Sequence, residues 1–303
     1  MNRRDFIAKG ISAGVFAGGA MTFGGFGSLV PESDTAYDLV AARGGDPVSM
    51  FDKSIESFGG IRSFVKKGQT VVIKPNIGWD VPAERAANTN PKLVARIIEH
   101  CLNAGAKDVY VFDYTCDNPQ KCYANSGIEK AVKDAGGKIA PGNDEKYYHE
   151  VDIPKGKVLK KAREHELILS SDVFINVPVL KSHDGATLTI SMKNLMGIIW
   201  DRRFYHQNDL HQCIADFVTY RKPDLNVVDA YRVVKRNGPR GVSEADVAEL
   251  KSMVISTDIV AADAAATKFF GMEPQNIRHI KIAHEMGVGN MNLDQLKINR
   301  IKV

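Results

Sequence analysis

The sequence predicts an α/β fold with a mainly parallel sheet, helices on both faces and a single large domain. Short β-branched runs, such as residues 69–76 and 172–179, alternate with amphipathic segments such as residues 91–105. A crossover helix between two strands is the connection that parallel strands require. No internal repeat or long linker interrupts residues 36–303, so we expect these residues to form one domain after a targeting segment at residues 1–35.

The first half of this domain contains two predicted strands, at residues 69–76 (QTVVIKPN) and 107–113 (KDVYVFD). A helix is expected between them because Pro91 suits the first helical position and Gly105 suits the end of a helix. Residues 126–135 are expected to form the next helix, which two glycines terminate.

The second half begins with a predicted strand at residues 172–179 (DVFINVPV). Residues 188–196 fit either state and are interpreted as a strand that runs into a short helix. The remaining elements alternate in type: strands at residues 224–229, 252–256 and 296–303, and helices at residues 210–220, 258–270 and 274–286.

The N-terminus is typical of a twin-arginine export signal. Arg3 and Arg4 precede two apolar residues and Lys9, and residues 10–30 are apolar and uncharged. A general secretory signal and a retained membrane anchor are the alternatives, although the many glycines suit a membrane helix poorly. We expect export by the twin-arginine machinery to the periplasm or another extracytoplasmic compartment, with no membrane span in the mature form. This route carries folded proteins, which is compatible with a cofactor inserted before export.

Charge and cysteine content exclude several classes of protein. The formal net charge is +4 without a concentrated basic segment, so nucleic acid is not an expected partner. The spacing of Cys101, Cys116, Cys122 and Cys213 fits neither a zinc site nor an iron–sulfur site, and we expect no iron–sulfur cluster. Cys116 and Cys122 either form a disulfide, remain free or bind a metal.

Polar residues follow the predicted strands: Lys74 and Asn76, then Asp113, then Lys181, His183 and Asp184, then Asp229. Because ligands bind at the carboxyl ends of strands in open α/β sheets, this distribution predicts a site there. Each residue also has a simpler explanation, as a solvated lysine or a helix-capping aspartate. His183 could carry protons near neutral pH or bind a metal together with Asp184.

Two further segments carry candidate anion-binding residues. Lys193 and Asn194 form a polar pair in an apolar frame, which would bind an anion at the start of a helix or else form an exposed face. Arg240 lies in a glycine-rich turn and would either bind a carboxylate or phosphate or remain solvated. His206 and His211 flank a helix start, but their spacing alone does not support a shared metal with His183.

Six short motifs recur in order: residues 73–76, 88–91, 178–183, 192–197, 228–230 and 237–239. Together they resemble domain-of-unknown-function family 362 over residues 37–303. The resemblance implies an α/β domain without an assigned reaction. Its matching positions imply these site residues: Lys74, Asn76, Thr89, Lys181, His183, Lys193, Asn194 and Asp229. Many members carry a ferredoxin-like segment with clustered cysteines, which this chain lacks, so the resemblance does not imply an iron–sulfur cluster here.

The leading hypothesis is an exported enzyme of unassigned reaction whose site binds a small anionic ligand, and in which His183 either moves protons or holds a divalent metal. The predicted catalytic residues are His183, Lys181, Asp229 and Asp113. The predicted substrate-binding residues are Lys74, Asn76, Thr89, Lys193, Asn194 and Arg240, and the predicted metal ligands are His183 and Asp184. The alternatives are a non-catalytic binding protein for a small anion or metal complex, and a redox protein that acts with a ferredoxin-type partner.

Overall fold

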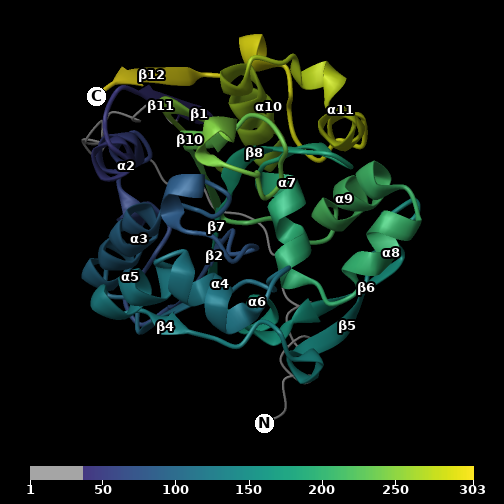
Figure 1. The fold of residues 1–303 in the computed structure, drawn as a ribbon, viewed down its shortest axis with the longest axis horizontal. Coiled ribbons are helices and arrows are strands. Elements are labelled where there is room, and N and C mark those ends of the chain that lie inside the picture. The colour runs from purple at the N-terminus through teal and green to yellow at the C-terminus, as the bar shows by residue number, and fades with distance from the viewer. Residues whose placement is uncertain (1–36) are drawn as a thin grey trace, which may run out of the picture. The chain divides into compact units, whose positions relative to one another are not determined.

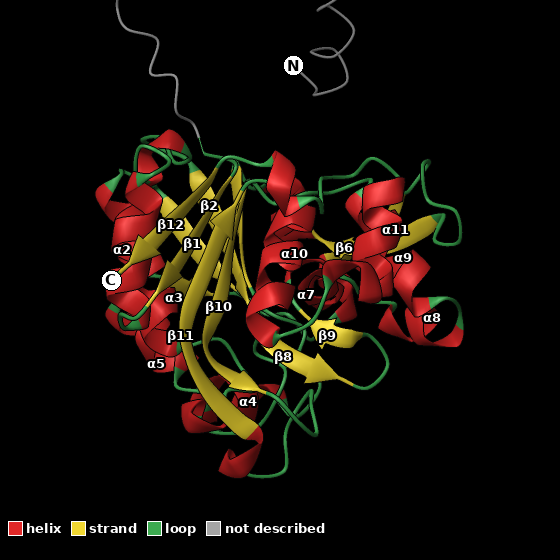
Figure 2. Cartoon of the chain, turned by 90° about the horizontal axis from the view of Figure 1, so that it is seen from above, coloured by secondary structure: helices red, strands yellow, loops and turns green. Residues whose placement is uncertain are grey.

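A mainly parallel sheet with helices on both faces forms the centre of the molecule and confirms the predicted fold class (Figures 1 and 2). The computed structural model describes residues 37–303. The predicted export signal lies outside these residues. Within them, no helix is both long and apolar enough to cross a membrane.

The strands of the sheet follow the spatial order β12-β1-β11-β10-β7-β2-β3-β4, and β8 and β9 extend it beside β10. Their bounds are β1 (Leu39–Arg43), β2 (Thr70–Pro75), β3 (Asp108–Val111), β4 (Lys138–Ile139), β7 (Val173–Val177), β8 (Val179–His183), β9 (Thr187–Thr189), β10 (Leu225–Val234), β11 (Val247–Ser256) and β12 (Ile298–Lys302). A separate hairpin contains β5 (Tyr148–Asp152) and β6 (Lys161–His165). Within the main strand order, β11 alone runs antiparallel to its neighbours.

Helices cover the two faces of the sheet in separate groups, which Figure 2 shows from above. One face packs against α2 (Pro47–Glu56), α3 (Pro91–Asn103) and α5 (Ile128–Asp134), with α4 (Pro119–Asn125) beside α5. The other face packs against α10 (Ile259–Phe270), which contacts α7 (Ser191–Asn194) and α11 (Arg278–Glu285). The remaining helices are α6 (Glu166–Ser170), α8 (Arg202–Gln207) and α9 (Leu210–Val218).

Most predicted elements are present, and three findings refine them. The strand expected at residues 172–179 is interrupted at Pro178, because proline has no N–H group to donate to a neighbouring strand. The helix expected from residue 274 begins at Arg278, after a 3₁₀ turn. The sequence analysis missed β1, α2, α4, β4 and the β5–β6 hairpin.

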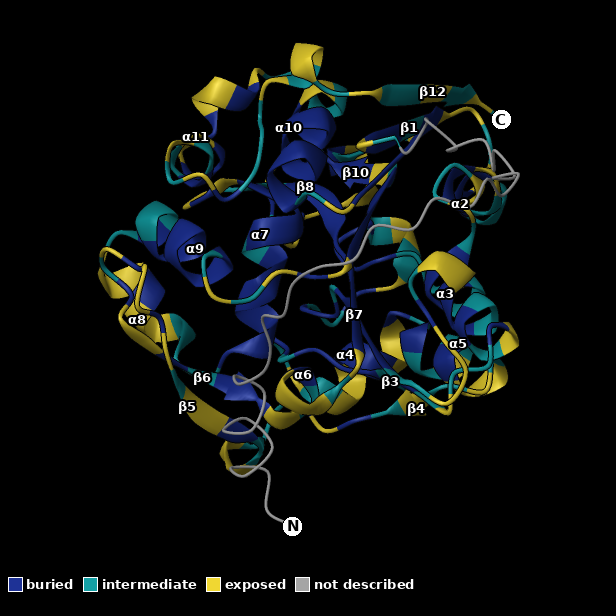
Figure 3. Ribbon diagram, turned by 180° about the vertical axis from the view of Figure 1, so that it is seen from behind, coloured by how far each residue is buried: buried dark blue, intermediate teal, exposed yellow. Residues whose placement is uncertain are grey.

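Helix α10 fixes the position of α7, which carries two of the predicted site residues. Both helices are largely buried, as the dark blue ribbon in Figure 3 shows. The carboxylate of Asp263, which is 0% exposed, accepts hydrogen bonds from the backbone N–H groups of Ser191 (2.7 Å) and Met192 (3.1 Å). The first turn of α7 therefore depends on one buried side chain from the helix behind it.

We expect Asp263→Ala to lower the free energy of unfolding by about 2–4 kcal/mol, because two buried N–H groups lose their acceptor. Chemical denaturation monitored by circular dichroism measures this change. Asp134→Ala, at a side chain that is 61% exposed, is the matched control and should change stability by less than about 0.5 kcal/mol. Equal stabilities of the two variants would contradict the assigned role of Asp263.

Candidate functional site

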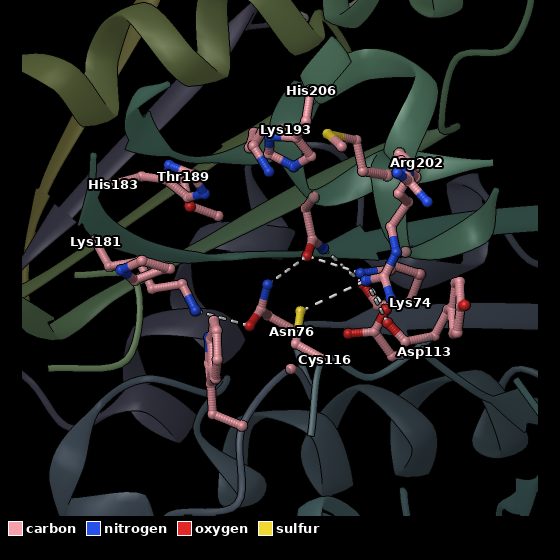
Figure 4. A pocket seen from close by; sticks show the side chains of 18 residues that line it. Lys74, Asn76, Asp113, Cys116, Lys181, His183, Thr189, Lys193, Arg202 and His206 are labelled. Atoms are coloured by element: carbon pink, nitrogen blue, oxygen red, sulfur yellow. Dashed lines mark hydrogen bonds and ion pairs between the residues drawn. The ribbon is translucent and has the colours of Figure 1, made fainter. Parts of the chain in front are cut away.

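A cavity of about 420 Å³ opens where β2 and β3 end, between these strand ends and β8, α7 and α8 (Figure 4). Its lining residues are Lys74, Asn76, Gly78, Trp79, Asp113, Tyr114, Cys116, Lys181, His183, Thr189, Lys193, Asn194, Met196, Gly197, Arg202, Arg203, His206 and Pro239. The structure thus brings together seven of the predicted site residues: Lys74, Asn76, Asp113, Lys181, His183, Lys193 and Asn194.

A buried ion pair forms one end of the cavity. Lys74 Nζ lies 2.9 Å from Asp113 Oδ1, and the two side chains are only 1% and 3% exposed. Asp113 Oδ2 also accepts a hydrogen bond from the backbone N–H of Ile77 at 2.6 Å. Burial lowers the pKa of Lys74, and the carboxylate of Asp113 opposes this shift. Each charge of the pair is therefore compensated by the other side chain inside the protein, away from solvent.

Amide side chains connect this ion pair to the opposite end of the cavity. Asn194 Oδ1 accepts hydrogen bonds from Lys74 Nζ (2.8 Å) and Asn76 Nδ2 (3.0 Å). Asn76 Oδ1 accepts in turn from Lys181 Nζ at 3.0 Å. The dashed lines in Figure 4 follow this chain of contacts from Lys181 to Asp113. The side-chain oxygen of each asparagine accepts a hydrogen bond from a lysine. These contacts fix the orientation of the amide groups and of the lysine head groups.

Thr89 supports the cavity from outside its lining. Its hydroxyl accepts a hydrogen bond from the backbone N–H of Asn76 (2.8 Å) and donates one to the backbone oxygen of Val177 (2.7 Å). The side chain is buried and both of its hydrogen-bonding roles are occupied by backbone. Thr89 therefore holds Asn76 in place and does not itself line the cavity.

Lys181 is a buried lysine that is 1% exposed. Its Nζ donates to Asn76 Oδ1 and to the backbone oxygen of Ala87, and it has no carboxylate partner among the described residues, 37–303. Burial lowers the pKa of Lys181 to about 7, and the nearby charge of Lys193 adds to this shift. Neutral and charged forms of this amine are thus both accessible near neutral pH.

Lys193 extends from α7 to the cavity and has neither a hydrogen-bond acceptor nor a carboxylate within bonding distance among residues 37–303. Burial lowers its pKa to about 8, and the charges of Arg202 and Lys74 act in the same direction. A cation without a counterion in a confined space is the simplest feature of an anion-binding site.

The structure places His183 in a different role from the predicted one. Its Nδ1 atom accepts from the backbone N–H groups of Gly185 (3.1 Å) and Ala186 (3.2 Å). Burial and the charges of Lys193 and Lys181 lower the pKa of His183 to about 3. The ring is therefore neutral at physiological pH with its proton on Nε2, which makes it a hydrogen-bond donor and unsuited to carry protons near pH 7.

The predicted metal site at His183 and Asp184 receives no support. Asp184 is exposed in the turn between β8 and β9 and does not line the cavity. Within the part of the chain that the structure describes, no group of three or more His, Cys, Asp or Glu side chains is arranged to hold a metal ion. Because Nδ1 of His183 already accepts two N–H groups, only Nε2 would remain as a ligand.

Two other predicted residues lie away from the cavity. Asp229 sits in the middle of β10 and accepts from the backbone N–H groups of Asn90 (2.8 Å) and Tyr231 (3.1 Å), so it caps the start of α3. Burial raises the pKa of Asp229 to about 6. Arg240 is 52% exposed and lies 3.9 Å from Asp117, while its neighbour Pro239 lines the cavity. Neither Asp229 nor Arg240 therefore lines this cavity.

The sequence analysis missed Arg202, which is held firmly at the cavity. Its guanidinium lies 3.8 Å from the ring centroid of Tyr114 and donates to the backbone oxygens of Tyr114 and Thr115, both at 2.9 Å. The ring of Tyr114 also stacks on the ring of Trp200, with centroids 4.8 Å apart. The adjacent basic residues Arg202 and Arg203 are a signal in the sequence, but they do not follow a predicted strand, which was the criterion for a site residue.

The cysteines are free. Cys116 is exposed and lines the cavity, where Arg202 Nη1 lies 3.5 Å from its sulfur, whereas Cys122 is buried. Of the alternatives considered for this pair, the disulfide is absent, and Cys116 provides a thiol at the cavity.

Glycine is required at position 197 by the ion pair. A Cβ there would overlap Asp113 Oδ1 and lie 2.5 Å from Lys74 Nζ. We expect Gly197→Ala to separate the pair and to lower the free energy of unfolding by about 3–5 kcal/mol, the usual cost of disrupting a buried ion pair. Thermal unfolding followed by circular dichroism measures this loss.

Gly185→Ala is the control for this substitution, because a Cβ at position 185 would meet its nearest neighbour, Leu210, at an ordinary 3.4 Å. It should leave the unfolding temperature within a few degrees of the unsubstituted protein. If Gly197→Ala has an equally small effect, the ion pair does not depend on the close approach of residue 197.

Comparisons with known proteins match most of the described chain. A thylakoid-associated protein of Synechocystis sp. is 25% identical over 242 residues, which cover 77% of this chain and 73% of that protein. Among solved structures, the lactate racemase apoprotein from Thermoanaerobacterium thermosaccharolyticum has 13% identity and a TM-score of 0.48. A protein from Thermotoga maritima has 8% identity and a TM-score of 0.45. The aligned regions span 58% and 60% of those two structures. The family model for "Domain of unknown function (DUF362)" matches residues 71–268, more than half of the chain, and the protein therefore belongs to this family.

Proposed function

We propose that the protein is an enzyme that binds a small molecule through a carboxylate or phosphate group in the cavity between β2, β8, α7 and α8. The observation that carries this proposal is the charge balance of the lining. Five cationic side chains line the cavity: Lys74, Lys181, Lys193, Arg202 and Arg203. Among residues 37–303, one carboxylate, Asp113, lines it, and Lys74 pairs with that carboxylate. The excess of cations favours an anionic ligand.

The unpaired cations would gain most from such a ligand. Lys193 and Lys181 lose hydration through burial without gaining a carboxylate, which lowers the pKa of each amine. An anion bound beside Lys193 would favour the charged form of this amine and raise its pKa, so binding should be accompanied by proton uptake near pH 8. The apolar part of the lining, which includes Trp79 and Met196, suits a short carbon skeleton.

Catalysis is favoured over simple binding by the near-neutral pKa of Lys181. A buried amine that titrates near pH 7 inside a cavity is typical of an acid–base residue, because proton transfer requires both of its forms. The alternative is a non-catalytic binding protein for a small anion, for which the cations alone suffice. A proton-transferring group has no purpose in that alternative.

Isothermal titration calorimetry with inorganic phosphate tests the anion site. We expect Lys193→Met to weaken phosphate binding by roughly ten- to a hundredfold, the loss that follows from removing a charged hydrogen-bond donor. Binding to the unsubstituted protein should weaken as the pH rises through about 8, where Lys193 loses its charge. Titrations in two buffers of different ionisation enthalpy should reveal proton uptake at pH 8.

Lys130→Met is the matched control, because Lys130 lies on α5 with a side chain that is 82% exposed. It should leave phosphate affinity unchanged. Bound phosphate should also slow the alkylation of Cys116 by N-ethylmaleimide, since this thiol lines the same cavity. Unchanged phosphate affinity in Lys193→Met would contradict the proposed site, and so would a rate of Cys116 alkylation that is the same with and without phosphate.

Export is a separate proposal, supported by the sequence of residues 1–30 alone. Replacing Arg3 and Arg4 together by lysine should retain the protein in the cytoplasm, because the twin-arginine route depends on the arginine pair. Immunoblots of cell fractions measure the distribution, and Lys9→Arg is the control that leaves the pair intact. Undiminished export of the double variant would favour the general secretory alternative.

A further inference from the structure

We propose that Lys181 and His183 are catalytic residues of an enolisation: Lys181 removes a proton from the carbon next to the carbonyl group of a small oxo acid, and His183 donates a hydrogen bond to the carbonyl oxygen. This inference rests on the proposed function, because the carboxylate of the oxo acid must bind the cations of the same cavity.

The surroundings of Lys181 suit a neutral amine. An amine carries two hydrogens and one lone pair, and Lys181 Nζ has two acceptors, Asn76 Oδ1 and the backbone oxygen of Ala87. Both hydrogens of the neutral amine are therefore engaged, and the lone pair occupies the remaining position on Nζ. Lys181 lines the cavity. A Schiff base of Lys181 would keep at most one hydrogen on nitrogen and would leave one of these two acceptors without a donor.

The surroundings of His183 suit a neutral donor. The N–H groups of Gly185 and Ala186 both point at Nδ1, so this atom is an acceptor and the ring proton is on Nε2. Both N–H groups belong to the backbone of the turn between β8 and β9, which makes the arrangement rigid. Figure 4 shows His183 and Lys181 on the same side of the cavity.

Charged groups face this pair from several elements. Lys74 on β2 and Lys193 on α7 act on Lys181, and so do Asp113 and Cys116 in the segment after β3. Lys193, Lys181 and His206 act on His183. The positive groups outnumber the single carboxylate, so the negative charge of an enolate would be stabilised where it develops.

The step is balanced without a co-reactant. The lone pair of Lys181 Nζ takes the proton, and the electrons of the broken C–H bond form the carbon–carbon double bond of the enolate. The π electrons of the carbonyl group move to its oxygen, which accepts the hydrogen bond from His183 Nε2–H. Return of a proton from the charged Lys181 restores the oxo acid, so the reaction exchanges hydrogen with solvent.

Hydrogen exchange into deuterated water tests the inference with three named probes: pyruvate, 2-oxobutyrate and 2-oxoglutarate. Proton NMR should show that the intact protein accelerates loss of the signal at the carbon next to the carbonyl group for at least one probe. Lys181→Met and Lys181→Arg should each abolish the acceleration, because arginine keeps hydrogen-bond donors and charge but is never neutral. His183→Phe should reduce it by roughly a hundred- to a thousandfold, the range for loss of one donor to an oxyanion.

Phosphate titration of the same samples separates the possible failures. No exchange with any of the three probes, in a protein that binds phosphate through Lys193, overturns the enolisation and leaves the anion site standing. Exchange that survives in a folded Lys181→Arg variant also overturns it. Absence of phosphate binding in the intact protein removes the anion site and the enolisation together. Circular dichroism verifies that each variant is folded.

Discussion

The buried ion pair between Lys74 and Asp113 is the constraint on which the rest of the site depends. It joins the ends of β2 and β3, and its atoms leave no room for a side chain at position 197. Separating these two charges inside the protein would leave each of them buried without a counterion. This costs far more free energy than separating an ion pair on the surface. The adjacent strand ends are therefore held in one arrangement, and the segments around them follow.

The pair also sets the electrostatics of the cavity. Because Asp113 is committed to Lys74, no carboxylate of the lining remains for Lys181 or Lys193. Burial disfavours both charges, and neighbouring cations add to this effect: Lys193 acts on Lys181, and Arg202 and Lys74 act on Lys193. Both amines therefore have lowered pKa values. The amides of Asn76 and Asn194 orient the lysines without neutralising them. The other cations of the lining therefore remain available for a ligand.

Periodicity and termination signals predicted the alternating strands and helices, because these depend on local sequence. Pro178 shows the limit: its sequence position was clear, but the switch from β7 to β8 depends on pairing with β10. The site was predicted in part by the rule that strand ends meet. The rule placed Asp229 at a strand end, but β10 continues to Val234. The rule did not identify Arg202, because helix α8 reaches the cavity from outside the sheet.

The roles proposed for Lys181 and His183 differ most from those expected from the sequence, and the reason is physical. By residue type, histidine titrates near neutral pH and lysine does not. Here burial lowers the pKa of both groups, which brings the lysine to about 7 and the histidine to about 3. Two backbone N–H groups then fix the histidine as a donor, and two oxygen acceptors suit the amine form of the lysine. Burial depends on the whole fold, so residues 181–184 predict a site but do not determine which of them would move a proton.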